Sequence, residues 1–178
     1  WHEMLTWYGF KCIGPFPEFP SAFSWEDSYS NLLGTIVGAH ALQDSEHEYN
    51  EAVQIALDQE MQKLGIQPAQ VARQASESVR GKWFTGNIIF HVDMKKRNFD
   101  IGLKNGCVTP TLIPEVSACP DAQPTPLAVP RLDVLAKYGF SANLEIEPHE
   151  WERGKILRIV YGNEPGKRIN PDQHFALI

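Results

Sequence analysis

Apolar positions in the first half of the chain repeat with the period of an α-helix. Val53, Leu57 and Met61 follow one another every four residues, the spacing that places side chains on one face of a helix. The same reasoning, combined with start and stop signals, predicts four helices. They cover the start of the chain up to Gly9, residues 24–42, residues 45–64 and residues 68–81.

Local signals mark the ends of these helices. Ser24 stands before two acidic residues and is expected to cap the second helix, and Ser45 with Glu48 matches a capping box at the start of the third. Gly65 is a natural stop for that third helix. Ser30, Gly34 and Gly38 form a line of small residues on the second helix, which we expect to admit another helix closely.

The second half changes to the alternating period of strands. Residues 87–93 and 98–103 predict two strands joined by the basic tip 95–97, and Asn105-Gly106 predicts a tight turn into a third strand from 107. Later runs at 144–146 and 155–161 predict two more strands.

Proline separates these segments. Residues 114–130 hold five prolines, which predicts an extended loop, and Pro130 is expected to open a short helix that ends at Gly139. Residues 147–152 fit a helical turn. The pattern as a whole predicts an α+β fold with N-terminal helices packed on a mostly antiparallel sheet from the C-terminal half. We expect one domain, with a helical part over about 1–81 and a sheet part over about 86–178.

Composition narrows the classes of function. The 178 residues are 43% hydrophobic and carry a net charge of −6, which argues against nucleic-acid binding because that needs a clustered basic face. The basic cluster Lys95-Lys96-Arg97 is expected to be solvated. No apolar run approaches the roughly 18 residues of a membrane span.

The cysteines and the first residue leave questions open. Cys107 and Cys119 bracket the proline-rich loop, so they either form a disulfide or remain free thiols. The chain starts on Trp1 inside a predicted helix, which indicates a processed protein or a piece of a longer chain.

The strongest chemical signal is His2-Glu3 on the first predicted helix. Zinc hydrolases often carry such a pair, with a second histidine four residues on and the glutamate as general base. Here Thr6 stands at that position. His2 as a metal ligand and Glu3 as a catalytic base are therefore candidates that need ligands from elsewhere, and a histidine beside a surface acid is the alternative.

The second predicted helix offers the missing groups. Asp27 and Asn31 lie four residues apart on one face, and we place them with Glu3 as candidate catalytic residues. His40 is the candidate second metal ligand, with zinc or another divalent metal as the cofactor. The alternative is a buried hydrogen-bond network.

Two weaker candidates complete the set. His47 and Glu51 have helical spacing for a ligand pair, but their acidic surroundings favour a solvated helix start. Cys12 could act as a nucleophile with His2 as its base, although nothing in the spacing requires it.

Four segments carry a family resemblance: residues 1–9, with Trp-His-Glu and Thr-Trp-Tyr-Gly; 23–34, with Ser-Asn-Leu-Leu-Gly; 99–110; and 145–152. Together they resemble the DUF4056 family of bacterial proteins of unknown function. The resemblance implies a periplasmic or envelope protein, and an exported lipoprotein among the alternatives. It implies no activity.

Two interpretations remain open. In the first, the chain is a metal-assisted, hydrolase-like enzyme whose site lies between the first helix and the 24–42 helix, with a small-molecule, peptide or glycan substrate. In the second, it is a non-catalytic binding or structural module of the envelope, where the polar strip is internal and the aromatic residues pack the core or meet a protein partner.

Overall fold

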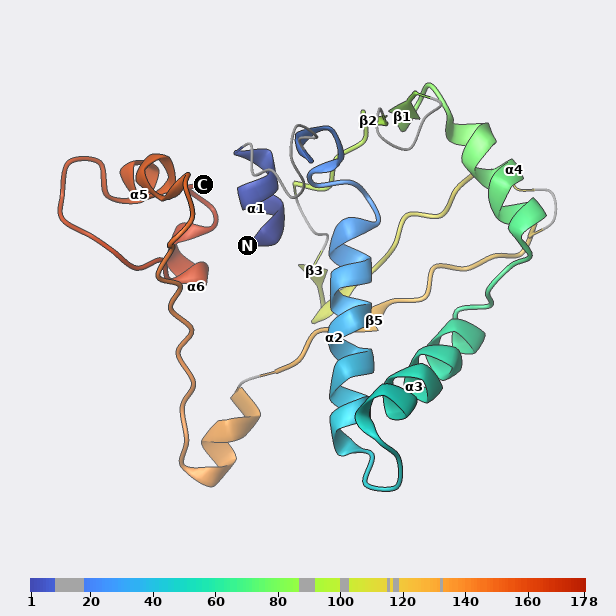
Figure 1. Cartoon of the computed structure of the whole chain (residues 1–178), viewed down its shortest axis with the longest axis horizontal. Coiled ribbons are helices and arrows are strands. Elements are labelled where there is room, and N and C mark those ends of the chain that lie inside the picture. Colours follow the sequence, from blue (N-terminus) through green and yellow to red (C-terminus); the bar gives the residue numbers. More distant parts are fainter. Residues whose placement is uncertain (9–17, 87–91, 100–102, 115, 117–118, 132) are drawn as a thin grey trace. The chain divides into compact units, whose positions relative to one another are not determined.

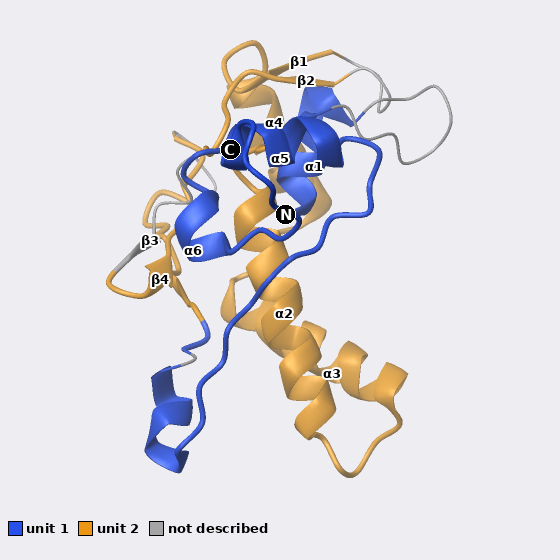
Figure 2. Cartoon of the chain, turned by 90° about the vertical axis from the view of Figure 1, so that its left-hand side faces the viewer, with its two compact units in different colours: residues 1–22, 130–178 blue, residues 23–129 orange. Residues whose placement is uncertain are grey.

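The chain divides into two compact units. The computed structural model describes residues 1–8, 18–86, 92–99, 103–114, 116, 119–131 and 133–178. Unit 1 combines residues 1–22 with 130–178, and unit 2 covers 23–129 (Figure 2). Each unit has its own packing and is described by itself.

Two packed helices form one side of unit 2. Helices α2 (Asp27–Gln43) and α3 (Tyr49–Lys63) lie side by side (Figure 1). Their buried positions are Val37 and Ala41 on α2 and Ala52 and Ala56 on α3. Alanine side chains are short, so the two backbones approach closely where they cross.

The buried face of α3 differs from the predicted one. Ala52, Ala56 and Glu60 face inward, whereas Leu57 is exposed. The predicted line through Leu57 had the right period but was rotated by one position. Within unit 2, a Cβ placed on Gly34 or Gly38 would meet no atom within 4 Å, so no helix of this unit packs against the predicted ridge of small residues.

Asp44, not Ser45, organises the start of α3. Its Oδ1 accepts hydrogen bonds from the backbone N–H groups of Glu46 and His47, at 2.8 and 3.0 Å. The helix begins at Tyr49, and Glu48, its N-cap residue, makes no capping bond with its side chain. The predicted capping box is therefore wrong, because Asp44 satisfies backbone donors of this loop first.

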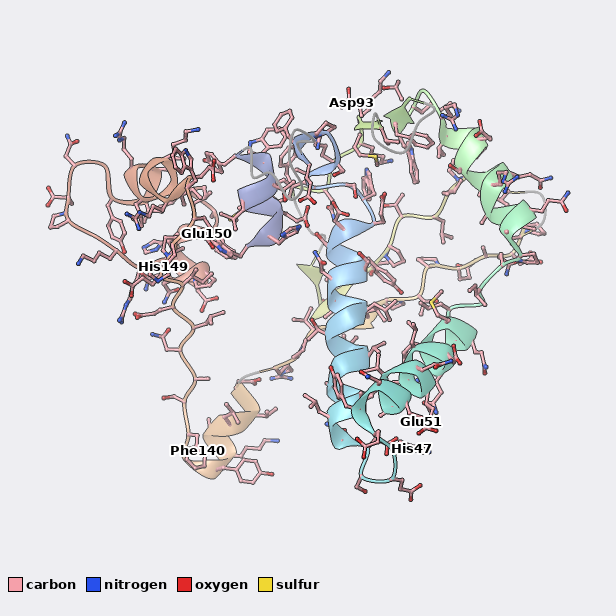
Figure 3. The ribbon with its side chains drawn as sticks, in the orientation of Figure 1. His47, Glu51, Asp93, Phe140, His149 and Glu150 are labelled. Atoms are coloured by element: carbon pink, nitrogen blue, oxygen red, sulfur yellow. The ribbon has the colours of Figure 1, made fainter. Side chains whose placement is uncertain are left out.

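His47 belongs to the same loop. Its Nδ1 lies 2.9 Å from Asp44 Oδ2, and Figure 3 shows it beside the start of α3, while Glu51 lies inside the helix. The hydrogen bond to Asp44 is the main reason that the pKa of His47 is raised from its ordinary 6.5. The backbone donor of Glu46, followed by the His47 side chain, lowers the pKa of Asp44 from 3.8.

The other half of unit 2 is a helix followed by very short strands. Helix α4 (Ala69–Val79) leads through Gly81, with φ of +81°, into β1 (Phe84–Thr85), which pairs antiparallel with β2 (Asp93–Met94). Positive φ is easy for glycine, so Gly81 ends the helix as predicted. The predicted strand 87–93 lies mostly outside the described residues.

The predicted turn at Asn105-Gly106 is confirmed. Both residues have positive φ, +53° and +73°, as a type I′ hairpin turn requires. The turn joins β3 (Leu103–Lys104) to β4 (Cys107–Val108), and β5 (Leu127–Ala128) pairs with β4 on the other side. Cys107 and Cys119 are free thiols.

Unit 1 is built from short helices. They are α1 (His2–Trp7), the 3₁₀ helices η1 (Phe19–Ser21) and η3 (Asp133–Tyr138), α5 (Arg153–Tyr161) and α6 (Pro171–His174). Leu5, Ile156 and Ile169 form its core. Ile146 and Ile169 exchange two backbone hydrogen bonds of 2.8 Å, so this one bridge is what remains of the predicted strand at 144–146.

The predicted strand at 155–161 is wrong, because this segment is helix α5. A short apolar run rich in isoleucine and valine fits either a strand or a buried helix. The structure decides for a helix, with Ile156 fully buried and Ile159 43% exposed. Gly162, with φ of +61°, follows its last residue.

The mixed α+β class is confirmed, with N-terminal helices and small antiparallel sheets in the later part of the chain. Every described strand has only two residues, so helices and loops carry most of the packing. Our expectation of a single domain stays a prediction. Among the described helices, none is both long and apolar enough to cross a membrane.

Replacing Ile156 by alanine is expected to lower the free energy of unfolding by about 2–5 kcal/mol, since it removes buried methyl groups and leaves a cavity. Ile159→Ala on the same helix should change it by only about 0.5 kcal/mol. Urea denaturation followed by circular dichroism measures both. Equal losses would contradict the assignment of the buried face of α5.

Titration of His47 by NMR should give a midpoint above 6.5, and Asp44→Asn should return it towards that value. Because the folded pKa is raised, the contribution of His47 to stability is complete below pH 6.5 and is lost as pH rises through the raised pKa. Asp44 contributes above pH 3.8 and loses this as pH falls through its lowered pKa. An unchanged His47 midpoint in the variant would show that the pair does not form.

Candidate functional site

His2 and Glu3 lie in the first turn of α1, in unit 1. The His2 side chain is 59% exposed, and its Nε2 lies 3.8 Å from Glu18 Oε2. Thr6, which stands where a zinc helix would have its second histidine, is buried. Its hydroxyl has no hydrogen-bond partner among the described residues.

Asp27 and Asn31 lie in the first two turns of α2, in unit 2. Asp27 Oδ2 accepts a hydrogen bond of 3.0 Å from the backbone N–H of Ser24. The carboxylate of Asp27 therefore caps the turn before α2. The prediction had given this capping role to Ser24, which instead donates its backbone N–H. A negative charge at the N-terminus of α2 also interacts favourably with the helix dipole. The Asn31 carbonyl accepts from the Thr35 hydroxyl at 3.0 Å.

His40 lies near the other end of α2. It is 13 residues beyond Asp27 in the sequence, which corresponds to about 20 Å along the helix axis. Its Nδ1 lies 3.7 Å from Glu60 Oε1, and that buried carboxylate binds Lys63 at 2.6 Å. A metal shell, with bonds of about 2 Å, cannot include both Asp27 and His40.

The joint site of His2 and Glu3 with α2 stays a prediction, because its members belong to different units. Within the described residues, no group of three or more histidine, cysteine, aspartate or glutamate side chains could hold a metal ion. The candidate nucleophile Cys12 lies outside these residues. His174 serves the start of α6, since its Nδ1 accepts a hydrogen bond of 3.0 Å from the backbone N–H of Asn170, the N-cap residue.

A cavity of about 310 Å³ lies within unit 2. Residues 72, 76 and 79 of α4 form one wall, since they share a helix face. The start of α2, the β1–β2 pair and residues 110–113 form the others. The lining residues are Trp25, Glu26, Tyr29, Ala72, Ser76, Val79, Trp83, Phe84, Met94, Pro110, Thr111 and Ile113.

The cavity is aromatic with few polar groups. Trp25 and Trp83 have ring centroids 6.3 Å apart and planes inclined by 25°. Glu26 is the one carboxylate in the described lining. The Tyr29 hydroxyl donates to the Thr125 carbonyl at 2.8 Å. Burial, followed by the Glu60 carboxylate, raises the pKa of Tyr29, so it remains a neutral phenol.

The Lys96 ammonium rests on both tryptophan rings. Its Nζ lies 4.4 Å from the Trp25 ring centroid and 4.5 Å from that of Trp83. These distances are typical of cation–π contacts, which contribute about 0.5–2 kcal/mol. No carboxylate of the described residues pairs with Lys96.

Backbone hydrogen bonds hold Lys96 in this position. The Trp83 carbonyl accepts from the N–H groups of Lys95 and Lys96, at 2.8 and 3.1 Å, and the Phe23 carbonyl accepts from that of Asn98 at 2.5 Å. The segment after β2 is thereby fixed between the two tryptophans.

The expectation that the basic cluster is solvated is therefore wrong in part. Lys96 is half-buried, and the Arg97 side chain is only 12% exposed, with Nη2 3.8 Å from Asp93 Oδ1 (Asp93 in Figure 3). Lys95 is exposed. No sequence signal pointed to this cluster, because no spacing rule joins positions 25, 83 and 96.

Arg80 supports the turn that carries Trp83. Its Nε and Nη2 bind both oxygens of Glu77 at 2.7 and 2.6 Å, which raises the pKa of the guanidinium. Nη1 donates to the Gly86 carbonyl, and the guanidinium carbon lies 5.0 Å from the Phe84 ring centroid. Such bidentate pairs are geometrically specific, so Arg80 fixes the path from α4 to β1.

The Trp25 indole N–H is buried and has no acceptor among the described residues. A buried, unpaired donor costs about 1–3 kcal/mol. This cost falls on the packing around Trp25, because the N–H is inaccessible to solvent.

Comparison with known families agrees with the resemblance in the sequence. Residues 1–108 match the model of DUF4056, described as a protein of unknown function. The match includes most of the cavity and all of the Trp25–Trp83–Lys96 cluster, but not the wall at 110–113. No curated protein and no solved structure matches the chain. Since the family model covers more than half of the sequence, the chain belongs to the DUF4056 family.

Proposed function

We propose that this chain is a non-catalytic binding module that takes a small ligand into the aromatic cavity of unit 2. The observation that carries the proposal is the concave, largely apolar lining around Trp25 and Trp83. Small-molecule sites typically have this character, with volumes upward of about 300 Å³ and a few polar groups that orient the ligand.

The chemistry of the lining favours binding over catalysis. Glu26 and Tyr29 are the titratable groups of the described lining, which contains no histidine or cysteine. Ser76 and Thr111 supply hydroxyl groups, but the described lining holds no histidine to activate them as nucleophiles.

The metal-assisted hydrolase remains a second candidate. It is supported by one observation, the exposed His2 imidazole beside Glu3 on a segment inside the family match. In this version His2 binds a divalent metal and Glu3 acts as general base towards a bound water.

We also propose a place in the bacterial envelope, which the family resemblance implies and which cell fractionation would test.

Binding of the neutral fluorescent probe N-phenyl-1-naphthylamine should test the cavity. Trp83→Ala is expected to weaken binding at least about tenfold, a loss of roughly 1.4 kcal/mol. Ala72 lines the cavity and is exposed, so Ala72→Trp should fill the cavity with a large side chain without removing a buried one. Trp151→Ala is the matched control, since Trp151 is 94% exposed and belongs to unit 1.

Two outcomes would contradict the binding proposal: no saturable binding to the unaltered chain, or binding by both cavity variants that is as tight as binding by the unaltered chain. Circular dichroism of each variant separates a blocked cavity from a lost fold.

For the hydrolase candidate, mass spectrometry should find near-stoichiometric zinc or another divalent metal in the purified, chelator-free protein. His2→Ala should lose it, because one strong ligand is removed. Metal-free protein in both cases would exclude His2 as a metal ligand.

A further inference from the structure

We infer that the aromatic cavity of unit 2 is a site for a small organic cation of the alkylammonium class. This inference rests on the proposed function and names the ligand chemistry of the same cavity. Three independent features carry it: a cation already placed on the rings, a carboxylate in the lining and the negative net charge of the full sequence.

The first feature is Lys96. Its ammonium lies within 4.5 Å of the ring centroids of Trp25 and Trp83, so the arrangement of these rings accommodates an alkylammonium group. Tryptophan is the best cation–π partner among the side chains, and aromatic cages of this kind recognise quaternary ammonium ligands. Lys96 is thus a tethered example of the group that the rings would bind.

The second feature is the charge of the lining. Glu26 lines the cavity, and no lysine or arginine is among the described lining residues. The two cations nearby, Lys96 and Arg80, lie over lining rings. A carboxylate beside aromatic faces favours a cation and disfavours an anion. Tyr29 and Phe84 add two further rings to the lining.

The third feature acts at longer range. The net charge of −6 attracts cations and raises their rate of encounter. It would repel an acidic ligand of the same size.

Lys96 limits the affinity of the site. A ligand cation that contacts the same rings must either displace the ammonium or bind near a like charge. Removing the charge of Lys96 should therefore strengthen binding, whereas removing that of Lys95 should not. Lys95 is the matched control, because it is the adjacent lysine and its Nζ points to the Gly81 carbonyl at 3.2 Å instead of to a ring.

The experiment compares choline with its neutral isostere 3,3-dimethyl-1-butanol, using the full chain. Indole N–H signals in NMR spectra report binding, and Trp83→Phe assigns the Trp83 signal. We expect choline to shift the signals of Trp25 and Trp83 but not those of Trp1, Trp7 and Trp151. Lys96→Gln should raise its affinity about fivefold, the equivalent of one cation–π contact, with no change in Lys95→Gln. Glu26→Gln should lower the affinity, and Glu51→Gln on α3 should not.

The outcomes separate this inference from the proposed function. If the neutral isostere binds at Trp25 and Trp83 as tightly as choline, the cavity binds ligands but the cation assignment is wrong. If neither compound binds to the Lys96→Gln chain and the naphthylamine probe also fails, both the inference and the proposed function fall. Binding of choline that Lys96→Gln weakens would also overturn the inference.

Discussion

The carbonyl group of Trp83 is the point on which the site in unit 2 depends. It accepts hydrogen bonds from two successive backbone N–H groups, those of Lys95 and Lys96. This fixes the segment after β2 against the turn after α4. The pairing of Phe84 with Met94 follows from the same alignment, so one carbonyl positions two lining residues and a cation. The strands themselves are two residues long and could not set this register alone.

The opposite edge of the same segment is held at Phe23. This residue has φ of +55°, a conformation that a bulky side chain adopts only at a cost of about 1–2 kcal/mol. Its carbonyl accepts from Asn98 and its ring lies 5.2 Å from that of Phe99. These contacts offset the strain at Phe23. They also place Trp25 against the Lys96 side chain, which Trp83 contacts as well.

Charged groups elsewhere in the chain are used mainly for structure. Asp27 and Asp44 satisfy backbone donors before α2 and α3, and Glu60 pairs with Lys63 on α3. A carboxylate engaged in this way is a weak candidate for a catalytic base, since its lone pairs already have partners. The half-buried Lys96 differs, because aromatic faces replace a carboxylate as its partner. The tryptophan rings beside α2 are therefore better candidates for a binding site than the acids of α2 are for a catalytic one.

The sequence by itself determined the local features. Helical periodicity predicted the places of α2, α3 and α4. The Asn105-Gly106 pair predicted a turn, where both residues have positive φ. Motifs within the first 108 residues indicated the family. These signals act over a few residues, so they need no knowledge of the fold.

Only the tertiary structure decided the rest. The run at 155–161 became a helix because burying Ile156 against Leu5 and Ile169 outweighs the strand preference of its residues. The cavity needs positions 25, 83 and 96, which no period relates. Their meeting depends on backbone hydrogen bonds between segments distant in the sequence, and such long-range pairing leaves no pattern along the chain.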